Sequence, residues 1–488
     1  MNLPLPPITT NSLKSNISYG ELQSYTFEEV SNWVDVLRNE LLHLWDNGQP
    51  PYLGLDEKTI IKRFQKLKEY PIDDFYFEDE LYPNYIGFIK NFSKIGSGVN
   101  QFFPALLKSR INGLSIHDFL SNQNLWLEFK YKIVQKVRFD KMYLYSSYLE
   151  NKNGVSDLDY FTNWESKING ELGFWVEPSG LNNLNEKSNR LKLDTEIVKN
   201  LQEKGVLGVP EMMNEVGYNV DGEIDGYLVR YYNKSQKVFP NLIQILRIGL
   251  NQVPVIFPVL TARWIYEKYL DKINNQDEFK VYDSSSGWGS RLLGSLCSNK
   301  KIHYIGTDVN TENHGCYERL GEFYNTNCNG SNTYEIYYDG SEEIHKNKKF
   351  QLHQGQIDLV FTSPPYFNRE EYSTHPEQSY IKYPNYQDWL DGFLDKTFQT
   401  YYEYLKPNRY CIINIADIKV GQKKFYPLEQ DTISIAIKNG FRYVGKLGMT
   451  MTRILGLNPT DTKNYWFDMK SKSIFKVEPI LIFKKNIK

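Results

Sequence analysis

A proline-containing motif that could hold an amino group follows one of the apolar runs of the chain. Residues 357–362 have the composition of a buried strand, and Ser363-Pro364-Pro365-Tyr366 comes directly after them. Consecutive prolines fix the backbone and lack amide donors, while their carbonyl groups remain as acceptors. The Ser363 hydroxyl can accept or donate, and Tyr366 offers an aromatic face. The motif therefore fits a site in which a base amino group is held beside a stacked ring, although Pro-Pro alone also suits an ordinary turn.

A glycine turn with two downstream aspartates suggests a nucleotide-like ligand. Gly287 and Gly289 follow a predicted strand and precede a predicted helix, where glycine permits a tight turn and close approach of a ligand. Asp308 ends the next predicted strand, roughly 20 residues further on, where a carboxylate can accept bonds from two ribose hydroxyls. Asp339 ends the third strand and is placed to read an adenine amino group. Either aspartate could instead only cap a helix or turn.

The elements that would position these residues form a regular alternation after about residue 255. Strands are predicted at 280–283, 303–307, 334–338, 357–362 and 410–415, and helices at 290–297, 312–324, 386–405 and 431–438. Such alternation predicts a doubly wound α/β fold with a parallel sheet, in which ligands bind at the carboxyl ends of the strands. Two last strands, 441–448 and 477–483, are expected to pair antiparallel at a sheet edge, with 454–472 as an insertion.

Residues 255–488 resemble the DNA amino-methyltransferases, which modify cytosine N4 or adenine N6. Ser363-Pro-Pro-Tyr366 matches the family's catalytic loop at all four places. Asp283, Gly287 and Gly289 match its cofactor loop, but Ser284 and Ser285 replace the usual Pro and Phe. The resemblance implies a Rossmann-like methyltransferase sheet that is parallel with a reversed terminal hairpin, S-adenosyl-L-methionine as cofactor, and no metal. The cofactor residues that it implies are Phe257, Asp283, Ser285, Gly287, Trp288, Gly289, Asp308 and Asp339.

The chemistry implied by the resemblance is methyl transfer to an exocyclic amino nitrogen of a flipped-out base in double-stranded DNA. The chain has no Pro-Cys motif, which argues against carbon-5 cytosine methylation. Ser363 at the first motif position favours cytosine N4, and adenine N6 remains the alternative. An RNA base methyltransferase is a further alternative. So are a nuclease–methyltransferase fusion, suggested by Glu128-Phe-Lys130 with Asp118 upstream, and a silent DNA-binding subunit.

The N-terminal half is predicted to be mainly helical or mixed, with a fold that the sequence does not identify. Residues 1–20 are expected to form a flexible arm, 21–240 a target-recognition domain and 245–488 the methyltransferase domain. Thr26 and Glu29 have capping-box spacing before a helix. Further helices are expected at 57–70, 125–148 and 194–204.

Composition narrows the class of protein without naming a partner. The net charge of -2 supplies no global attraction to DNA, so a DNA-binding protein of this kind needs a local basic surface. The cysteines lack metal-ligand spacing, and the absence of a signal peptide or membrane-spanning run predicts a cytoplasmic protein. Association with other modification or restriction subunits is a further expectation. Residues 368–385 could close over a flipped base or form a solvated crossover. Eight basic residues could either contact DNA phosphates or simply be exposed to solvent. They are Lys419, Lys423, Lys424, Arg453, Lys463, Lys470, Lys472 and Lys476.

Overall fold

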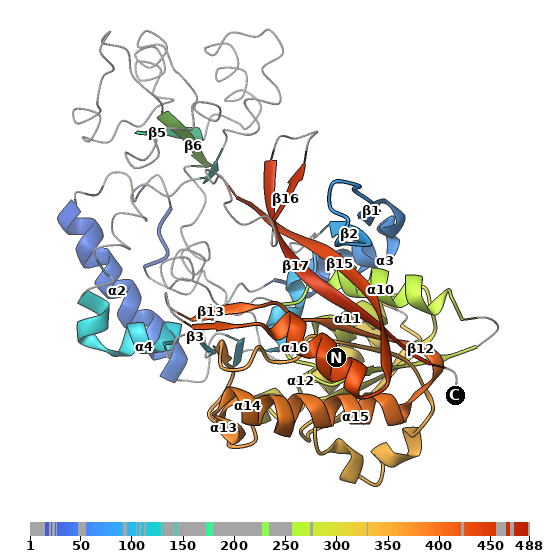
Figure 1. Cartoon of the computed structure of the whole chain (residues 1–488). Coiled ribbons are helices and arrows are strands. Elements are labelled where there is room, and N and C mark those ends of the chain that lie inside the picture. Colours follow the sequence, from blue (N-terminus) through green and yellow to red (C-terminus); the bar gives the residue numbers. More distant parts are fainter. Residues whose placement is uncertain are drawn as a thin grey trace, which may run out of the picture. The chain divides into compact units, whose positions relative to one another are not determined.

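The computed structural model describes residues 15–130 and 256–486 apart from short gaps, together with strands β4 (Met142–Tyr143), β5 (Leu172–Pro178) and β6 (Tyr227–Asn233) (Figure 1). The gaps are 19–20, 22–24, 26, 47–54, 91–94, 104, 107–108, 112–113, 128–129, 274–276, 329, 421–423, 455–464 and 469–472. The chain forms two compact units. Residues 1–7, 52–115 and 253–488 make up the sheet unit, and residues 8–51 and 116–252 make up the second unit.

A 10-stranded sheet organises the sheet unit. Its order is β1 (Tyr76–Phe77), β2 (Gly87–Lys90), β15 (Phe441–Ile454), β17 (Ser473–Lys485), β12 (Leu405–Asn414), β10 (Ile357–Thr362), β7 (Phe279–Asp283), β8 (Ile302–Thr307) and β9 (Thr333–Tyr337), with β16 (Tyr465–Asp468) paired to β17. Strands β12, β10, β7, β8 and β9 are mutually parallel. Because β17 is antiparallel to both β12 and β15, the sheet has the reversed terminal hairpin that the resemblance implied. The predicted fold class is confirmed.

The hairpin is not at the edge of the sheet, where the sequence placed it. β17 lies between β12 and β15, and β15 pairs in parallel with β2 from the N-terminal half. Leu447 pairs with Gly87, and Thr450 pairs with Lys90. A short strand four residues long carries too little periodicity to be recognised as part of a sheet so distant in sequence.

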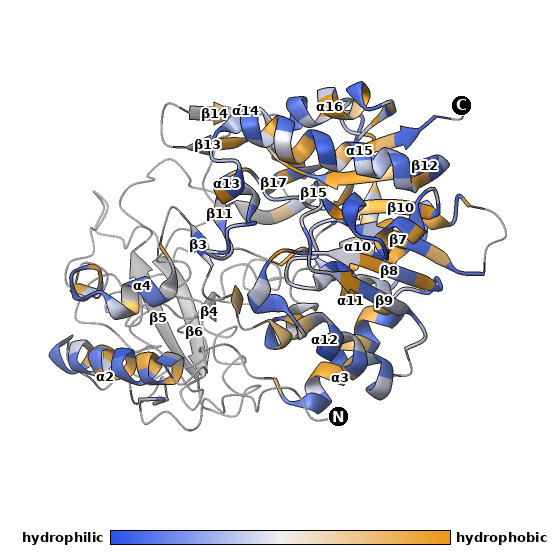
Figure 2. Ribbon diagram, turned by 90° about the horizontal axis from the view of Figure 1, so that it is seen from below, coloured by the Kyte–Doolittle hydropathy of each residue, from blue (hydrophilic) through white to orange (hydrophobic). Residues whose placement is uncertain are grey.

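Helices cover both faces of the sheet (Figure 2). One face packs against α3 (Glu57–Glu69), α10 (Val259–Leu270), α11 (Ser290–Leu296) and α12 (Cys316–Asn327); the other packs against α14 (Tyr386–Trp389), α15 (Asp395–Tyr404) and α16 (Leu428–Lys438). Successive strand side chains point to opposite faces. Leu359 therefore lies in the hydrophobic core on the α10 side of the sheet, and Val360 lies in the core on the α15 side. Burial on both faces explains why apolar residues occupy the successive positions 359–361 rather than alternating with polar ones.

Most elements predicted after residue 255 are found near their expected positions. The helix predicted over 386–405 contains a π-helical segment, Leu390–Leu394, between α14 and α15. It ends at Tyr404, shortly before Pro407, as expected. Short 3-10 helices are Ile72–Phe75, Ser97–Phe102, Thr311–Asn313, Ile344–Lys346 and Phe350–His353.

The predicted division at residues 240–245 differs from the compact units. Residues 52–115 belong to the sheet unit, so residues 21–240 are not one separate domain. Helix α3, which begins after its N-cap Asp56, buries Ile60 and Phe64 in the core below the sheet. The Phe64 ring stacks on Tyr324 of α12, with centroids 4.7 Å apart. The N-terminal half thus supplies part of the scaffold of the predicted methyltransferase domain.

The second unit contains α2 (Phe27–Asp46), α4 (Ile116–Ser121) and the sheet β4-β6-β5. Residues 15–17, at the end of the predicted flexible arm, are buried, and the Trp33 indole donates to the Ser15 carbonyl at 2.7 Å. The prediction of a helix over 125–148 is wrong at Met142–Tyr143, which form strand β4. Thr26 and residues 194–204 lie outside the described residues.

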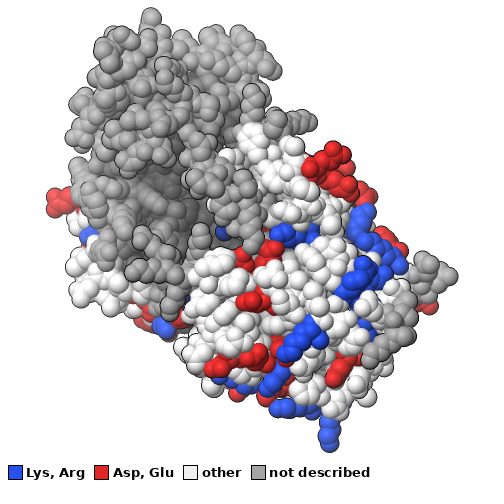
Figure 3. Space-filling view, viewed as in Figure 1, with Lys and Arg blue, Asp and Glu red and all other residues white. Residues whose placement is uncertain are grey.

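Charged side chains of both signs lie on the face of the molecule seen in Figure 3, interspersed over its described part. No helix among the described residues is long and apolar enough to cross a membrane.

Candidate active site

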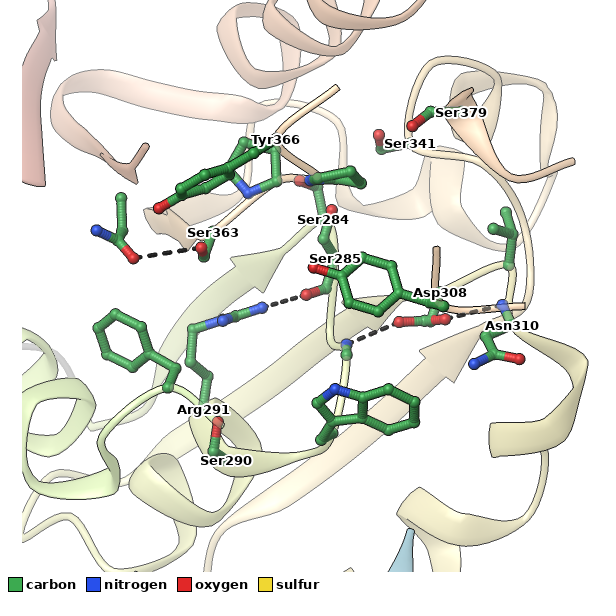
Figure 4. A pocket seen from close by; sticks show the side chains of 18 of the residues that line it. Ser284, Ser285, Ser290, Arg291, Asp308, Asn310, Ser341, Ser363, Tyr366 and Ser379 are labelled. Atoms are coloured by element: carbon green, nitrogen blue, oxygen red, sulfur yellow. Dashed lines mark hydrogen bonds between the residues drawn. The ribbon is translucent and has the colours of Figure 1, made fainter. Parts of the chain in front are cut away.

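A cavity of about 310 Å³ opens at the carboxyl ends of the parallel strands. It brings together most of the residues singled out from the sequence (Figure 4). The predicted residues that line it are Phe257, Ser285, Gly287, Trp288, Asp308, Asp339, Ser363, Pro364, Pro365 and Tyr366. Asp283 and Gly289 do not line it. The glycine turn and the proline motif, widely separated in sequence, therefore share one cavity.

The glycine turn adopts the left-handed backbone that glycine permits. Gly287 and Gly289 have φ values of 53° and 67°. A Cβ at Gly289 would lie 2.5 Å from an atom of the Phe103 ring. Phe103 comes from the N-terminal half and also contacts Trp288 and Tyr317 edge-on. Gly289 is therefore a packing residue beside the cavity, whereas Gly287 lies at its wall.

Asp283 holds the glycine turn in place through buried hydrogen bonds. Its carboxylate is fully buried and accepts bonds from Arg291 Nε at 2.8 Å and from the Tyr304 hydroxyl at 2.5 Å. Arg291 also donates to the Ser285 carbonyl and lines the cavity. This buried ion pair holds the loop in place of the Pro-Phe pair that the chain lacks. Sequence reasoning missed Arg291 because an arginine in a helical first turn usually faces solvent.

Asp308 lies across the turn from Gly287. Its carboxylate accepts from the Gly287 backbone N–H at 2.7 Å and from that of Asn310 at 2.8 Å (Figure 4). Burial raises the pKa of Asp308 to about 6, although the two backbone N–H groups favour the charged form. A carboxylate at this depth gains strongly from additional hydroxyl donors.

Two asparagines near Asp308 have buried polar atoms with no partner among the described residues. These atoms are Asn310 Nδ2 and Asn313 Oδ1, and both residues line the cavity. An unpaired buried amide group is unfavourable by about 1–3 kcal/mol. A polar ligand that is not part of the chain would satisfy them. The sequence carried no signal for this pair beyond its proximity to Asp308.

The Ser363 hydroxyl is oriented by a residue that the sequence did not identify. Ser363 Oγ donates to Asn414 Oδ1 at 3.3 Å, and Asn414 Nδ2 donates to the Pro479 carbonyl at 3.0 Å. A carbonyl can only accept, so the amide nitrogen must face Pro479 and the amide oxygen must face Ser363. Ser363 therefore uses its proton on Asn414. Its lone pairs remain free to accept a bond from the cavity.

The side chain of Tyr366 is held by a residue of β17. Its hydroxyl donates to Glu478 Oε1 on β17 at 2.6 Å. The next residue, Phe367, is buried and has a φ of 49°, which side chains other than glycine rarely adopt. The Phe367 ring packs against Tyr386, with centroids 5.3 Å apart. Ring packing and the Glu478 bond together fix where the Tyr366 face lies.

Residues 368–385 form part of the cavity wall. Tyr372, Gln378 and Ser379 line the cavity, and Gln378 and Ser379 are almost completely buried. Strand β11 (Glu370–Glu371) pairs with β3 (Arg110–Ile111), and Tyr372 contacts Trp288 edge-on. Helix α13 (Ser379–Lys382) follows. Of the two interpretations left open, a solvated crossover does not describe these three residues.

Phe257 and Asp339 take different positions at the cavity. The Phe257 ring is 9% exposed and lies beneath the Arg291 guanidinium at 5.7 Å. Asp339 is exposed at the rim and accepts a bond from Asn347 at 2.8 Å. Its expected contact with an adenine amino group stays a prediction.

Several sequence hypotheses fall largely outside the described residues. Glu128 of the suggested nuclease motif lies outside the described residues. The ammonium group of Lys130 donates to the carboxylate of Asp35 on α2 at 2.5 Å. Among the proposed phosphate-binding residues only the side chain of Lys476 is described, and it is exposed. No group of three or more His, Cys, Asp or Glu side chains that could hold a metal ion occurs in the described part of the chain.

Comparisons with known proteins give distant similarities. No protein-family model and no curated protein sequence matches the chain. A Pyrococcus horikoshii protein, provisionally described as an RNA methyltransferase, is 16% identical, with a TM-score of 0.27 over 47% of this chain and 86% of its own. A Thermus thermophilus protein, provisionally described as a DNA modification methylase and complexed with S-adenosyl-L-methionine, is 22% identical, with a TM-score of 0.21 over 31% and 54% of the two chains. A Galdieria sulphuraria protein, provisionally described as a sarcosine dimethylglycine methyltransferase, is 12% identical, with a TM-score of 0.28 over 46% and 85%. Because these TM-scores are low, the fold assignment rests on the strand order of this chain.

Proposed function

We propose that this chain transfers a methyl group from S-adenosyl-L-methionine to an exocyclic amino nitrogen of a base in DNA, with cytosine N4 favoured over adenine N6. One observation carries the proposal. The Ser363 hydroxyl is oriented by Asn414 as an acceptor in the cavity that also contains Asp308 and Gly287. An oriented acceptor beside an aromatic ring suits an amino group that must be held and aligned.

The residues of the glycine turn fit the proposed cofactor. Asp308 is placed to accept bonds from ribose hydroxyls, and Asn310 and Asn313 offer the buried amide atoms that lack partners among the described residues. Phe257 and Trp288 supply apolar wall beside them. The cavity volume is at the lower end of the range for small-molecule sites, roughly 300–1,000 Å³. The cofactor supplies the methyl group that is transferred.

The proline motif has the groups that methyl transfer to an amino nitrogen requires. The amino lone pair of a base is delocalised into the ring and is a poor nucleophile. Bonds from the amino hydrogens to Ser363 Oγ and the Pro364 carbonyl favour a pyramidal nitrogen, which localises the lone pair. Tyr366 stacks on the ring of a base that has left the helix, and base stacking on an aromatic side chain contributes about 1–3 kcal/mol. Positioning then supplies much of the rate enhancement.

The cysteines do not suit a mechanism through a covalent thiol adduct. None of the four cysteines lines the cavity, and burial raises the pKa of the Cys297 thiol to about 12. A neutral buried thiol is a poor nucleophile. The chain therefore favours direct transfer to an amino group over carbon-5 methylation of cytosine.

Target recognition is proposed for the second unit, with residues 52–115 now assigned to the scaffold of the sheet unit. DNA as the partner is carried over from the resemblance of the proline motif.

The proposal is tested with the full chain, radiolabelled S-adenosyl-L-methionine and separate pools of duplex DNA, RNA and protein. Label is expected in DNA, in a nucleoside that carries an N-methyl group. Label in RNA alone would show that the substrate is RNA and would leave the proposed methyl transfer unchanged. Label in protein alone, or in no pool despite measured cofactor binding, would overturn the proposal.

A further inference from the structure

Arg291 is a buried cation at the cavity whose hydrogen-bonding capacity is only partly used by the chain. Only 5% of the residue is exposed, yet it lines the cavity. Its guanidinium has five N–H donors and cannot be deprotonated in a protein. Nε donates to the Asp283 carboxylate at 2.8 Å, and Nη2 donates to the Ser285 carbonyl. No acceptor for the two N–H groups of Nη1 occurs among the described residues.

The unused nitrogen of Arg291 is accessible from the cavity. Nη1 is not one of the unpaired polar atoms that are sealed from solvent in the described part of the chain, so it faces the cavity that the residue lines. The Phe257 ring packs against the guanidinium at 5.7 Å and leaves less of it open to water.

The acid that pairs with Arg291 is fully engaged within the chain. Asp283 Oδ1 accepts from the Ser285 N–H at 3.2 Å, and Oδ2 accepts from Arg291 and from the Tyr304 hydroxyl at 2.5 Å. A largely buried donor without an acceptor is unfavourable, and an ionised acceptor gives the stronger bond. The remaining donors of Arg291 therefore favour an anionic group that enters from the cavity.

Arg291 and Asp308 approach the glycine turn from its two sides (Figure 4). Arg291 bonds to the Ser285 carbonyl, and Asp308 bonds to the Gly287 N–H two residues further along. A ligand whose ribose bonds to Asp308 and that extends along the turn can place an anionic group against Arg291. S-adenosyl-L-methionine has one negative group, the carboxylate of its methionine part, whereas its ammonium and sulfonium groups are positive.

We propose that Arg291 binds the methionine carboxylate of S-adenosyl-L-methionine through Nη1, while Asp283 holds the guanidinium in place. This inference rests on the proposed function and deepens it, because it assigns the contact at the amino-acid end of the cofactor. The contact lies at the part of the cofactor loop that departs from the family that the sequence resembles, where Ser284 and Ser285 replace Pro and Phe.

The alternative role of Arg291 is only to pair with Asp283 and support the turn, and two ligands separate the roles. S-adenosyl-L-methionine and its decarboxylated form differ only in the carboxylate. A distorted turn weakens the binding of both ligands, whereas loss of the carboxylate contact weakens the binding of S-adenosyl-L-methionine alone. Calorimetry on the full chain without DNA gives the ratio of the two dissociation constants.

Two double variants each remove one buried ion pair. Asp283→Asn/Arg291→Met removes the pair at the cavity and leaves no unpaired carboxylate behind. Arg263→Met/Glu267→Gln is the matched control, because Arg263 is 2% exposed and bonds to Glu267 at 2.8 Å but does not line the cavity. Arg291→Lys is a milder variant, which keeps a positive charge beside Asp283 and lacks the planar fork of donors.

The wild-type protein should bind S-adenosyl-L-methionine roughly 10- to 100-fold more tightly than the decarboxylated form. In Asp283→Asn/Arg291→Met the two affinities should agree within about threefold, and Arg291→Lys should give an intermediate ratio. The control should keep the wild-type ratio, because its ion pair does not touch the cavity.

Two results would overturn the inference. One is equal affinity of the wild-type protein for the two ligands. The other is the wild-type ratio in whichever Arg291 variant is folded. Failure of the proposed function is a separate outcome, because the wild-type protein would then bind neither ligand or would transfer no methyl group to DNA.

Discussion

Replacing Asn414 tests whether the Ser363 hydroxyl works as an oriented acceptor. Asn414 is 2% exposed and connects Ser363 Oγ to the Pro479 carbonyl. Asn414→Leu removes both bonds at nearly constant volume. The two bonds together contribute about 1–3 kcal/mol, and leaving a buried carbonyl unpaired costs about 1–3 kcal/mol, so the free energy of unfolding should fall by roughly 2–6 kcal/mol.

The effect on catalysis is separable from the effect on stability. Without Asn414, the Ser363 hydroxyl can turn its proton toward the incoming amino group. Losing one aligned bond of about 1 kcal/mol should lower the single-turnover rate by roughly fivefold at saturating cofactor and DNA. Asn414→Asp keeps an oxygen for Ser363 and loses only the donor to Pro479. Because it also sets a carboxylate oxygen against the Pro479 carbonyl, it should be clearly less stable than the wild-type protein, yet the folded variant should methylate faster than Asn414→Leu.

A double variant decides whether Asn414 acts through Ser363. Ser363→Ala should slow the chemical step, and Ser363→Ala/Asn414→Leu should be no slower than Ser363→Ala alone. Cofactor affinity is measured in parallel to show that the cavity is intact. Multiplicative rate losses in the double variant, or a wild-type rate in folded Asn414→Leu, would refute the orientation of Ser363 by Asn414.

Three further predictions concern the cofactor turn and the catalytic loop. Because burial raises the pKa of Asp308 to about 6 and the ionised form accepts ribose hydroxyls, cofactor affinity should be full above that pH and fall about tenfold per unit below it. Calorimetry should find weak, pH-independent binding for Asp308→Asn, and a retained slope would contradict the assignment. Gly289→Ala should destabilise the fold by about 1–3 kcal/mol more than Gly355→Ala. Both have left-handed φ values, but only a Cβ at Gly289 would meet Phe103, whereas nothing lies within 4 Å of one at Gly355; equal melting temperatures would contradict this. Phe367→Ala should lower stability by about 3–5 kcal/mol, less any relief of strain, and should weaken DNA methylation more than cofactor binding.

The parallel part of the sheet was predictable because its strands are buried on both faces. Val281 and Tyr282 pack into opposite cores, so apolar side chains occupy successive positions of the strand rather than alternate ones. The glycine turn and the proline motif were predictable for a related reason. Both follow such runs directly, and the topology of a parallel sheet brings the carboxyl ends of its strands together.

The residues missed by sequence reasoning act through contacts between distant segments. Asn414 meets the proline motif because β12 pairs with β10, and Glu478 meets it because β17 pairs with β12. No local pattern indicates either pairing. Phe103 approaches Gly289 from the N-terminal half, where the four-residue strand β2 also joins the sheet. Side-chain periodicity reports burial within one element, and it carries no information on which remote element provides the partner.

The central claim is tested most directly by identifying the methylated nucleoside. Duplex DNA is incubated with the full chain and S-adenosyl-L-methionine carrying a deuterated methyl group, digested to nucleosides and analysed by mass spectrometry, with Ser363→Ala and Tyr366→Ala in parallel. The wild-type protein is expected to produce deuterated N4-methylcytosine, and either variant is expected to produce much less. N6-methyladenine would correct the choice of base and keep the mechanism. Deuterated 5-methylcytosine would contradict the proposed methyl transfer to an amino nitrogen. So would a Tyr366→Ala variant that produces as much methylated nucleoside as the wild-type protein.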